Sequence, residues 1–345
     1  MRYSDSINTE ILATMGPTLG DKQQIHQAIA LGVSNFRIHM GVRSRDRFQY
    51  FKNVRDVEAE SSYHVEVLID MPTAKPRVGK MQNLTPIAGK VYKVVDLEQT
   101  DNAHTIPLRG LTKLLIGLNI GDRVVFSDGK LVFKIIDKNQ SELYMECLYA
   151  NTNIISQISS CVFPDSNVEF DLFDQDDLEV LKKMQSHMLR PDWIAISFAS
   201  GKNQIDQVKQ VATSLWDNSI KYMAKIESTK GLQNISEIIE NVDGIMVARG
   251  DLLSFIEPYK LPYIQQGLIK KARKHKKATV VATEMLEKFA ESGVICRPEL
   301  SDIALAVRQK ASAVMLSVET SNSARSEECI TLMNNIIHYE RRNIL

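Results

Sequence analysis

Short apolar segments rich in isoleucine, valine and alanine recur along the chain, and stretches with helical spacing separate them. Eight segments are predicted as strands: Glu10–Met15, Val33–Met40, Val65–Asp70, Trp193–Phe198, Tyr222–Ile226, Gly244–Ala248, Thr279–Thr283 and Ala313–Ser317. The predicted helices are Lys22–Leu31, Arg45–Glu58, Gln175–His187, Asn203–Leu215, Leu232–Glu240, Tyr263–His275, Glu299–Arg308 and Glu327–Tyr339. Apolar strands that alternate with helices are typical of a buried parallel sheet. Eight such units favour a closed (β/α)₈ TIM barrel over an open sheet.

After the third predicted strand, the succession of strands and helices is interrupted. Apolar and polar residues alternate there over short segments and show no helical period, as in Arg123-Val124-Val125-Phe126 and Leu131–Ile136. The Asp128-Gly129 pair between them is typical of a hairpin turn. We therefore expect an inserted all-β domain over residues 79–169, with the barrel formed by residues 1–78 and 170–345. An insertion at the C-terminal end of a barrel strand is a candidate lid, and a purely structural insertion is the alternative.

Composition and charge narrow the class of protein. The 345 residues are 44% hydrophobic and 24% charged, and 42 Lys and Arg balance 42 Asp and Glu. A net charge of zero gives no electrostatic reason to expect a nucleic-acid or membrane partner. The four cysteines show no Cys-x-x-Cys spacing, so neither a disulfide framework nor a zinc site is expected. With no signal-peptide core and no run of 18 apolar residues, we expect a cytoplasmic protein.

Polar residues gather at the predicted C-terminal strand ends, where TIM barrels build their active sites. From the second strand to the eighth they are Arg37, His39, Asp70, Lys225, Glu227, Arg249, Gly250, Asp251, Thr283, Glu284, Ser317 and Glu319, with Lys75 and Arg77 shortly after the third strand. Two carboxylates from adjacent strand ends, Glu227 and Asp251, can share one divalent cation. Lys225 faces the same side as Glu227 and can neutralise a phosphoryl group or an enolate. The alternative is a set of ion pairs that only closes the barrel end.

The motifs that contain these residues resemble those of the pyruvate kinase family over nearly the whole chain. The most specific are Ala224-Lys225-Ile226-Glu227, Asp243-Gly244-Ile245-Met246-Val247-Ala248-Arg249-Gly250-Asp251-Leu252, Ala282-Thr283-Glu284-Met285-Leu286 and Ser301-Asp302-Ile303-Ala304. The resemblance implies a phosphotransferase that converts phosphoenolpyruvate and ADP to pyruvate and ATP, as in glycolysis. It also implies that Glu227 and Asp251 hold Mg²⁺ or Mn²⁺.

The same resemblance implies roles for the other residues. The expected catalytic residues are Lys225, Arg37, Thr283, Ser317 and Glu319, of which Lys225 stabilises the transferring phosphoryl group and the enolate. The expected substrate-binding residues are Arg37, Arg77, Ala248, Arg249, Gly250, Asp251 and Thr283, and the expected nucleotide-binding residues are Thr14, Pro17, Arg37 and Arg77.

Departures from the family pattern concern the monovalent cation. His39 and Gly41 replace an Asn and a Ser that coordinate potassium in the family, and Met71 replaces a third ligand. Lys75 stands where potassium-dependent members have Glu and potassium-independent members typically have Lys. A tethered ammonium can replace the bound cation electrostatically, so we expect activity without K⁺.

Three positions that the resemblance places near the nucleotide also differ from the family pattern. Val42, Ser159 and Asn322 replace a histidine and two lysines of the family. The alternatives are therefore a repurposed metal-dependent enzyme acting on phosphoenolpyruvate, pyruvate or another 2-oxo acid via a metal-bound enolate, or a non-catalytic binding protein. Because the sequence ends just after the last predicted helix, we expect no C-terminal regulatory domain, and a monomer or homodimer.

Overall fold

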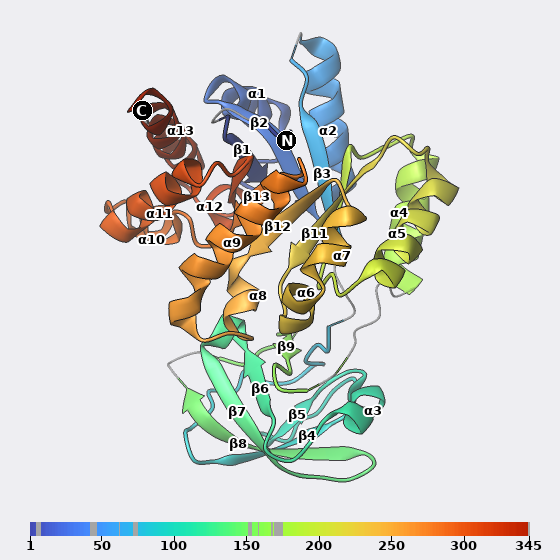
Figure 1. Ribbon diagram of the computed structural model, residues 1–345. Helices are drawn as coiled ribbons and strands as arrows, with labels where there is room; N and C mark the ends of the chain where they lie inside the picture. Colours follow the sequence, from blue (N-terminus) through green and yellow to red (C-terminus); the bar gives the residue numbers. More distant parts are fainter. Residues whose placement is uncertain are drawn as a thin grey trace. The chain divides into compact units, whose positions relative to one another are not determined.

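The computed structural model describes residues 1–4, 8–41, 47–61, 63–71, 75–150, 154–157, 159–166, 168 and 175–343 (Figure 1). The chain divides into two compact units. The barrel unit comprises Met1–Pro72, Leu172–Gly250 and Tyr259–Leu345, and the insertion unit comprises Thr73–Asp171 and Asp251–Pro258. Among the residues described, no helix is both long and apolar enough to cross a bilayer.

The barrel unit is built on a closed parallel barrel, which confirms the predicted fold class. Its strands are β1 (Glu10–Thr14), β2 (Val33–His39), β3 (Glu66–Met71), β10 (Trp193–Ile196), β11 (Lys221–Ile226), β12 (Gly244–Ala248), β13 (Ala278–Ala282) and β14 (Ala313–Leu316). Strand β1 pairs with both β2 and β14 and so closes the ring. Five of the strands are buried along their whole length, because side chains fill the interior while helices cover the outside.

Two sets of helices accompany the barrel strands. The longer ones are α1 (Lys22–Ala30), α2 (Arg47–Glu60), α4 (Gln175–Ser186), α5 (Lys202–Leu215), α9 (Leu261–Lys274), α11 (Arg297–Arg308) and α13 (Ser326–Asn343). Shorter segments are α6 (Thr229–Gln233), α7 (Ile235–Glu240), α8 (Arg249–Leu253), α10 (Glu287–Ser292), α12 (Val318–Ser321) and η3 (Pro258–Lys260). Helix α5 shows why the longer ones pack: Ile205, Val208 and Ala212 bury one face at helical spacing. Three of the short helices begin within three residues of a strand end and hold site residues in tight turns.

The insertion unit contains a six-stranded sheet in the order β5-β4-β8-β7-β6-β9. The strands are β4 (Val91–Val95), β5 (Thr105–Pro107), β6 (Arg123–Phe126), β7 (Leu131–Lys138), β8 (Glu142–Ala150) and β9 (Cys161–Val162), with α3 (Leu111–Leu114), η1 (Leu115–Gly117) and η2 (Ser127–Gly129) between them. The predicted hairpin is confirmed, because Phe126 pairs with Leu131 across η2 and Gly129 has φ 91°.

The insertion unit has a hydrophobic core of its own. Alternate residues of β7, Leu131, Phe133 and Ile135, are buried in it. Val78 belongs to the same core and bridges to Leu108, so residues that the predicted boundary places in the barrel pack with the insertion. The segment Asp251–Pro258 also clusters with this unit, which no local sequence pattern indicates.

Candidate active site

A buried carboxylate organises the C-terminal ends of β2, β3 and β11. Asp70, with no exposed surface, accepts hydrogen bonds at Oδ2 from Arg37 Nε at 2.8 Å, and Arg37 Nη2 lies 2.7 Å from the same oxygen. Lys225 Nζ lies 3.2 Å from Asp70 Oδ1. Burial alone raises the pKa of Asp70, but Lys225, Arg37 and His39 outweigh it and hold this pKa below its usual range. Asp70 is therefore a fixed anion that orients two cations.

The ammonium of Lys225 is held on three sides. Besides Asp70 it lies 3.0 Å from Glu227 Oε1 and donates to Ser197 Oγ at 3.0 Å. Ser197 in turn donates to the carbonyl oxygen of Met71 at 2.7 Å. Three partners match the three N–H groups of an ammonium, so Lys225 is held in position within a buried site. Ser197 is not among the site residues predicted from the sequence, although it is the last residue but one of the fourth predicted strand.

Glu227 follows β11 and is almost fully buried, at 2% exposed. Its Oε2 accepts a hydrogen bond of 2.7 Å from the backbone N–H of Phe198. Phe198 has φ 51°, a left-handed conformation that is uncommon for a non-glycine residue. Such outliers concentrate at functional sites because the surrounding structure must maintain them. The turn after β10 thus fixes one oxygen of Glu227 and Lys225 the other.

The ends of β12 and β13 bring together three of the predicted substrate-binding residues. Ala248 ends β12, and Gly250 donates its backbone N–H to Thr283 Oγ1 at 2.9 Å. Thr283 has φ 73° and Glu284 has φ 52°. Arg249 does not share this arrangement, since its guanidinium binds Asp302 and the carbonyl oxygens of Ala282 and Thr283.

The ends of β14 and β1 carry the remaining predicted barrel residues. Glu319 is buried and accepts backbone hydrogen bonds from Ser317 at 2.6 Å and from Leu286 at 3.1 Å. Thr14 Oγ1 accepts a hydrogen bond of 3.1 Å from Arg37. This bond links the end of β1 to the cation cluster, which consists of Arg37, Lys225 and the residues that hold them, Asp70, Glu227 and Ser197. Pro17 is exposed in the turn that follows β1.

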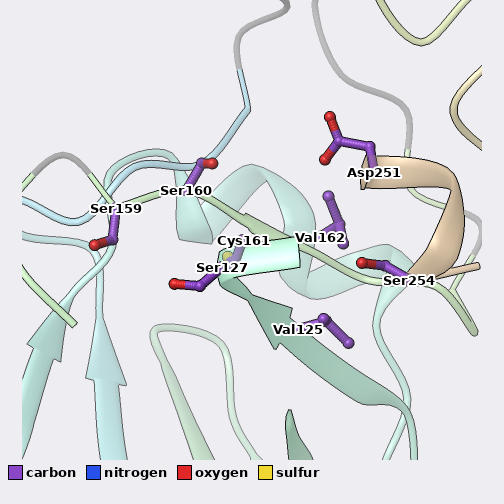
Figure 2. A pocket seen from close by; sticks show the side chains of 8 residues that line it. All are labelled: Val125, Ser127, Ser159, Ser160, Cys161, Val162, Asp251 and Ser254. Carbon is purple, nitrogen blue, oxygen red and sulfur yellow. The ribbon is translucent and has the colours of Figure 1, made fainter. Parts of the chain in front are cut away.

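The insertion unit contains the other predicted residues, Lys75, Arg77 and Asp251. Lys75 Nζ donates to both carboxylate oxygens of Asp251, at 2.8 and 2.7 Å. Arg77 forms a backbone bridge to Ser160. Asp251 and Ser254 line a cavity of about 270 Å³ together with Ser127, Ser159, Ser160 and three apolar or sulfur-bearing residues (Figure 2).

The donor chemistry of two residues fits a hard divalent cation. Glu227 and Asp251 offer carboxylate oxygens, and Mg²⁺ typically takes one or two protein carboxylates and completes its shell with water and substrate oxygens. Among the described residues there is no group of three or more His, Cys, Asp or Glu able to hold a metal. Glu227 belongs to the barrel unit and Asp251 to the insertion unit, and their pairing remains a prediction.

Two of the three nucleotide-side departures are described in the structure. Ser159 accepts a hydrogen bond from the backbone N–H of Ser156 at 3.0 Å, and Asn322 is exposed. Val42 lies outside the described residues.

Comparisons with known proteins agree with this architecture. A sequence model for the barrel domain of pyruvate kinase matches residues 6–330. Pyruvate kinase from Thermococcus litoralis is 30% identical over 336 residues, covering 96% of this chain and 69% of the relative. That of Methylorubrum extorquens is 30% identical over 346 residues, covering 99% and 70%. A crystal structure of a Cryptosporidium parvum pyruvate kinase has a TM-score of 0.86 and 26% identity, covering 98% of this chain and 70% of that one. The chain therefore belongs to the pyruvate kinase family, whose members are phosphotransferases.

Proposed function

We propose that this protein transfers the phosphoryl group of phosphoenolpyruvate to ADP, with Mg²⁺ or Mn²⁺ and without a requirement for K⁺. The observation that carries the proposal is the ammonium of Lys225, fixed by Asp70, Glu227 and Ser197 at the C-terminal end of the barrel. Phosphoryl transfer depends mainly on positioning and on charge neutralisation, and a fixed cation supplies both.

Each group of residues has a distinct task in this reaction. Lys225 neutralises charge on the transferring phosphoryl group and on the enolate oxygen left behind. Arg37, oriented by Asp70, binds phosphate oxygens, since a guanidinium presents several donors in a fixed plane. Thr283 and the backbone N–H of Gly250 would bind the carboxylate of the substrate, in exchange for the bonds by which Gly250 donates to Thr283 and Thr283 donates to the carbonyl oxygen of Ala282. Ser317 and Glu319 would take part in the proton transfer to the enolate, the role that the family resemblance implies for them.

Glu227 and Asp251 would hold the divalent ion, which when bound neutralises phosphate and enolate oxygens and orients them. The role of the chain is to prepare these ligands. Glu227 has one oxygen fixed by Phe198 and the other by Lys225, so its carboxylate is oriented in advance.

A coupled assay for ATP formation from phosphoenolpyruvate and ADP with Mg²⁺ tests the main proposal. The Lys225→Met variant is expected to lose about 10²–10³-fold in kcat, because it removes a preorganised cation from the reacting oxygens. Lys270→Met, on the exposed face of α9, is the matched control and is expected to retain wild-type rates. Equal activity of the two variants would contradict the role of Lys225.

The expected independence from K⁺ rests on the chemistry near Asp70. Met71 offers a thioether, which suits alkali ions poorly, and its carbonyl oxygen already accepts a bond from Ser197. Replacement of K⁺ by tetramethylammonium in the assay is expected to change kcat by less than about twofold, because the tethered ammonium of Lys75, which would replace the bound cation, remains in place. A strong loss of turnover in this exchange would show that the chain requires K⁺.

A second candidate function is metal-dependent chemistry on a 2-oxo acid with an acceptor other than ADP. One observation favours it: Ser159 and Asn322 stand where the family has lysines, whereas polyphosphates are usually bound by cations. Tight binding of oxalate by a wild-type protein that forms no ATP would support this candidate. A protein that bound neither oxalate nor Mn²⁺ would be a non-catalytic relative.

A further inference from the structure

Lys75 and Asp251 form an ion pair inside the insertion unit although 176 residues separate them in sequence. A single ammonium contacts both carboxylate oxygens, at 2.8 and 2.7 Å. The side chains are partly buried, with 14% and 24% exposed surface for Lys75 and Asp251. Both oxygens that a metal would use at Asp251 are thus engaged by a cation of the protein itself.

Asp251 also faces the cavity of the insertion unit. Figure 2 shows its side chain among the residues, including Ser160, Val162 and Ser254, that line one cavity of about 270 Å³. The side chain of Ser254, only 5% exposed, adds a hydroxyl to the lining. The lining of this cavity therefore supplies serine hydroxyls as well as the carboxylate of Asp251, and both are oxygen donors of the kind that a hard divalent ion prefers.

A divalent ion and an ammonium cannot share the same carboxylate oxygens at bonding distance without strong repulsion between the two cations. We propose that Lys75 occupies Asp251 in the metal-free protein and that the divalent ion displaces it. Lys75 is then a residue that sets the affinity and selectivity for divalent metal. The inference rests on the proposed metal role of Asp251 and assigns Lys75 a task beyond replacement of a monovalent cation.

Calorimetric titration with Mn²⁺ in the absence of substrate tests the competition. The Lys75→Met variant is expected to bind Mn²⁺ about three- to tenfold more tightly than wild type, the range of a partly exposed ion pair. Lys80→Met removes one exposed lysine of the same unit and is expected to change the Kd by less than about twofold. Asp251→Asn is expected to weaken binding at least about tenfold, because it removes a charged ligand.

The outcomes separate the two proposals. In one outcome, Asp251→Asn weakens Mn²⁺ binding, but Lys75→Met binds Mn²⁺ no more tightly than Lys80→Met does. This outcome overturns the competition and leaves the metal role of Asp251 intact. Binding that Asp251→Asn does not weaken overturns the metal role, and the competition with it. Absence of Mn²⁺ binding in wild type and in every variant likewise overturns both.

A second readout reports on the lysine directly. In protein labelled with ¹³C at the lysine ε-carbons, the Lys75 resonance, assigned with Lys75→Arg, is expected to shift during titration with diamagnetic Mg²⁺, with the midpoint that a separate calorimetric titration with Mg²⁺ gives. The Lys80 resonance is expected to stay unchanged. A Lys75 resonance that does not move while Mg²⁺ binds would overturn displacement.

Discussion

Ser197 is the smallest side chain in the cation cluster, yet it joins three strands. Its hydroxyl accepts from Lys225 and donates to Met71, so it restrains the ammonium without adding charge. We expect Ser197→Ala to lower kcat about tenfold, since a hydrogen bond to a charged group contributes about 1.5–3 kcal/mol. The KM for phosphoenolpyruvate is expected to change little in steady-state assays.

A conservative substitution of Ser197 distinguishes a role in positioning the Lys225 ammonium from a role in side-chain packing. Ser197→Thr retains the hydroxyl and is expected to keep most of the activity, whereas an effect on packing alone would make both variants similar. A Ser197→Ala enzyme with a wild-type kcat would show that Asp70 and Glu227 suffice to position Lys225.

The sequence indicates part of this site and misses the rest for physical reasons. Lys225 and Glu227 are two residues apart in a strand, so their common direction follows from the period of the strand. Ser197 could have been predicted by applying the strand-end rule to the fourth strand. The left-handed backbone of Phe198 has no residue signal, because glycine is absent there. The Lys75–Asp251 pair depends on contacts between distant segments and has no local pattern.

At the scale of elements, the N-terminal ends of β3, β10 and β11 are joined by Glu66. Its carboxylate binds the ammonium of Met1, Lys221 Nζ at 2.8 Å and Trp193 Nε1 at 2.8 Å. Burial raises the pKa of Glu66, but the Met1 ammonium, Lys221 and Trp193 more than compensate and lower this pKa to about 2. The folded state therefore favours the ionised carboxylate.

This shift predicts a specific dependence of stability on pH. Because the pKa of Glu66 is lower in the folded state, its contribution is complete above the unfolded pKa and is lost as pH falls from about 4.5 towards about 2. Glu66→Gln is expected to lower the free energy of unfolding by about 3 kcal/mol at pH 7 and by much less near pH 2. Urea unfolding at both pH values, with the exposed Glu240→Gln as control, measures the difference; a pH-independent deficit would contradict the assignment.

Helix α1 begins with a complete capping box. Asp21 accepts from the backbone N–H of Gln24 at 2.8 Å, and the Gln24 side chain accepts from the Asp21 backbone at 3.1 Å. Asp21→Ala is expected to lower the free energy of unfolding by about 1 kcal/mol, because the backbone N–H of Gln24 in the first turn loses its partner. The exposed Gln23→Ala serves as the control in denaturant unfolding. Equal stability of the two variants would show that water replaces the cap.

The elements themselves were predictable to different degrees. Every predicted barrel strand overlaps the observed strand to within two residues at each end, because a buried parallel strand is a short continuous apolar run. The short helices α8, α10 and α12 lie outside every predicted helix, since four to six residues rarely display a helical period, although the predicted helix Leu232–Glu240 covers α7 and the end of α6. Helices α8 and α12 hold predicted site residues, whereas Lys225 lies in a strand that the sequence predicts.

At the scale of the whole molecule, each unit has a hydrophobic cluster of its own. The cluster of the insertion unit includes Phe133, which packs edge-on against Tyr92 and Phe126 with ring centroids 6.0 and 5.7 Å away. A second cluster lies in the barrel, and Val280 is one of its fully buried residues. Among the described residues, none belongs to both of these clusters. Each unit therefore has the apolar burial that a cooperative folding unit requires.

We therefore expect core substitutions to act on one unit at a time. Phe133→Ala is expected to destabilise the insertion unit by about 3–5 kcal/mol, since it leaves a cavity between aromatic rings. Hydrogen exchange followed by mass spectrometry is expected to show faster exchange over β4 to β8 and unchanged protection over β10 to β14. Val280→Ala, in the barrel core, is expected to produce the reverse pattern. Faster exchange throughout the chain in Phe133→Ala would instead show that the two cores unfold as one cooperative unit.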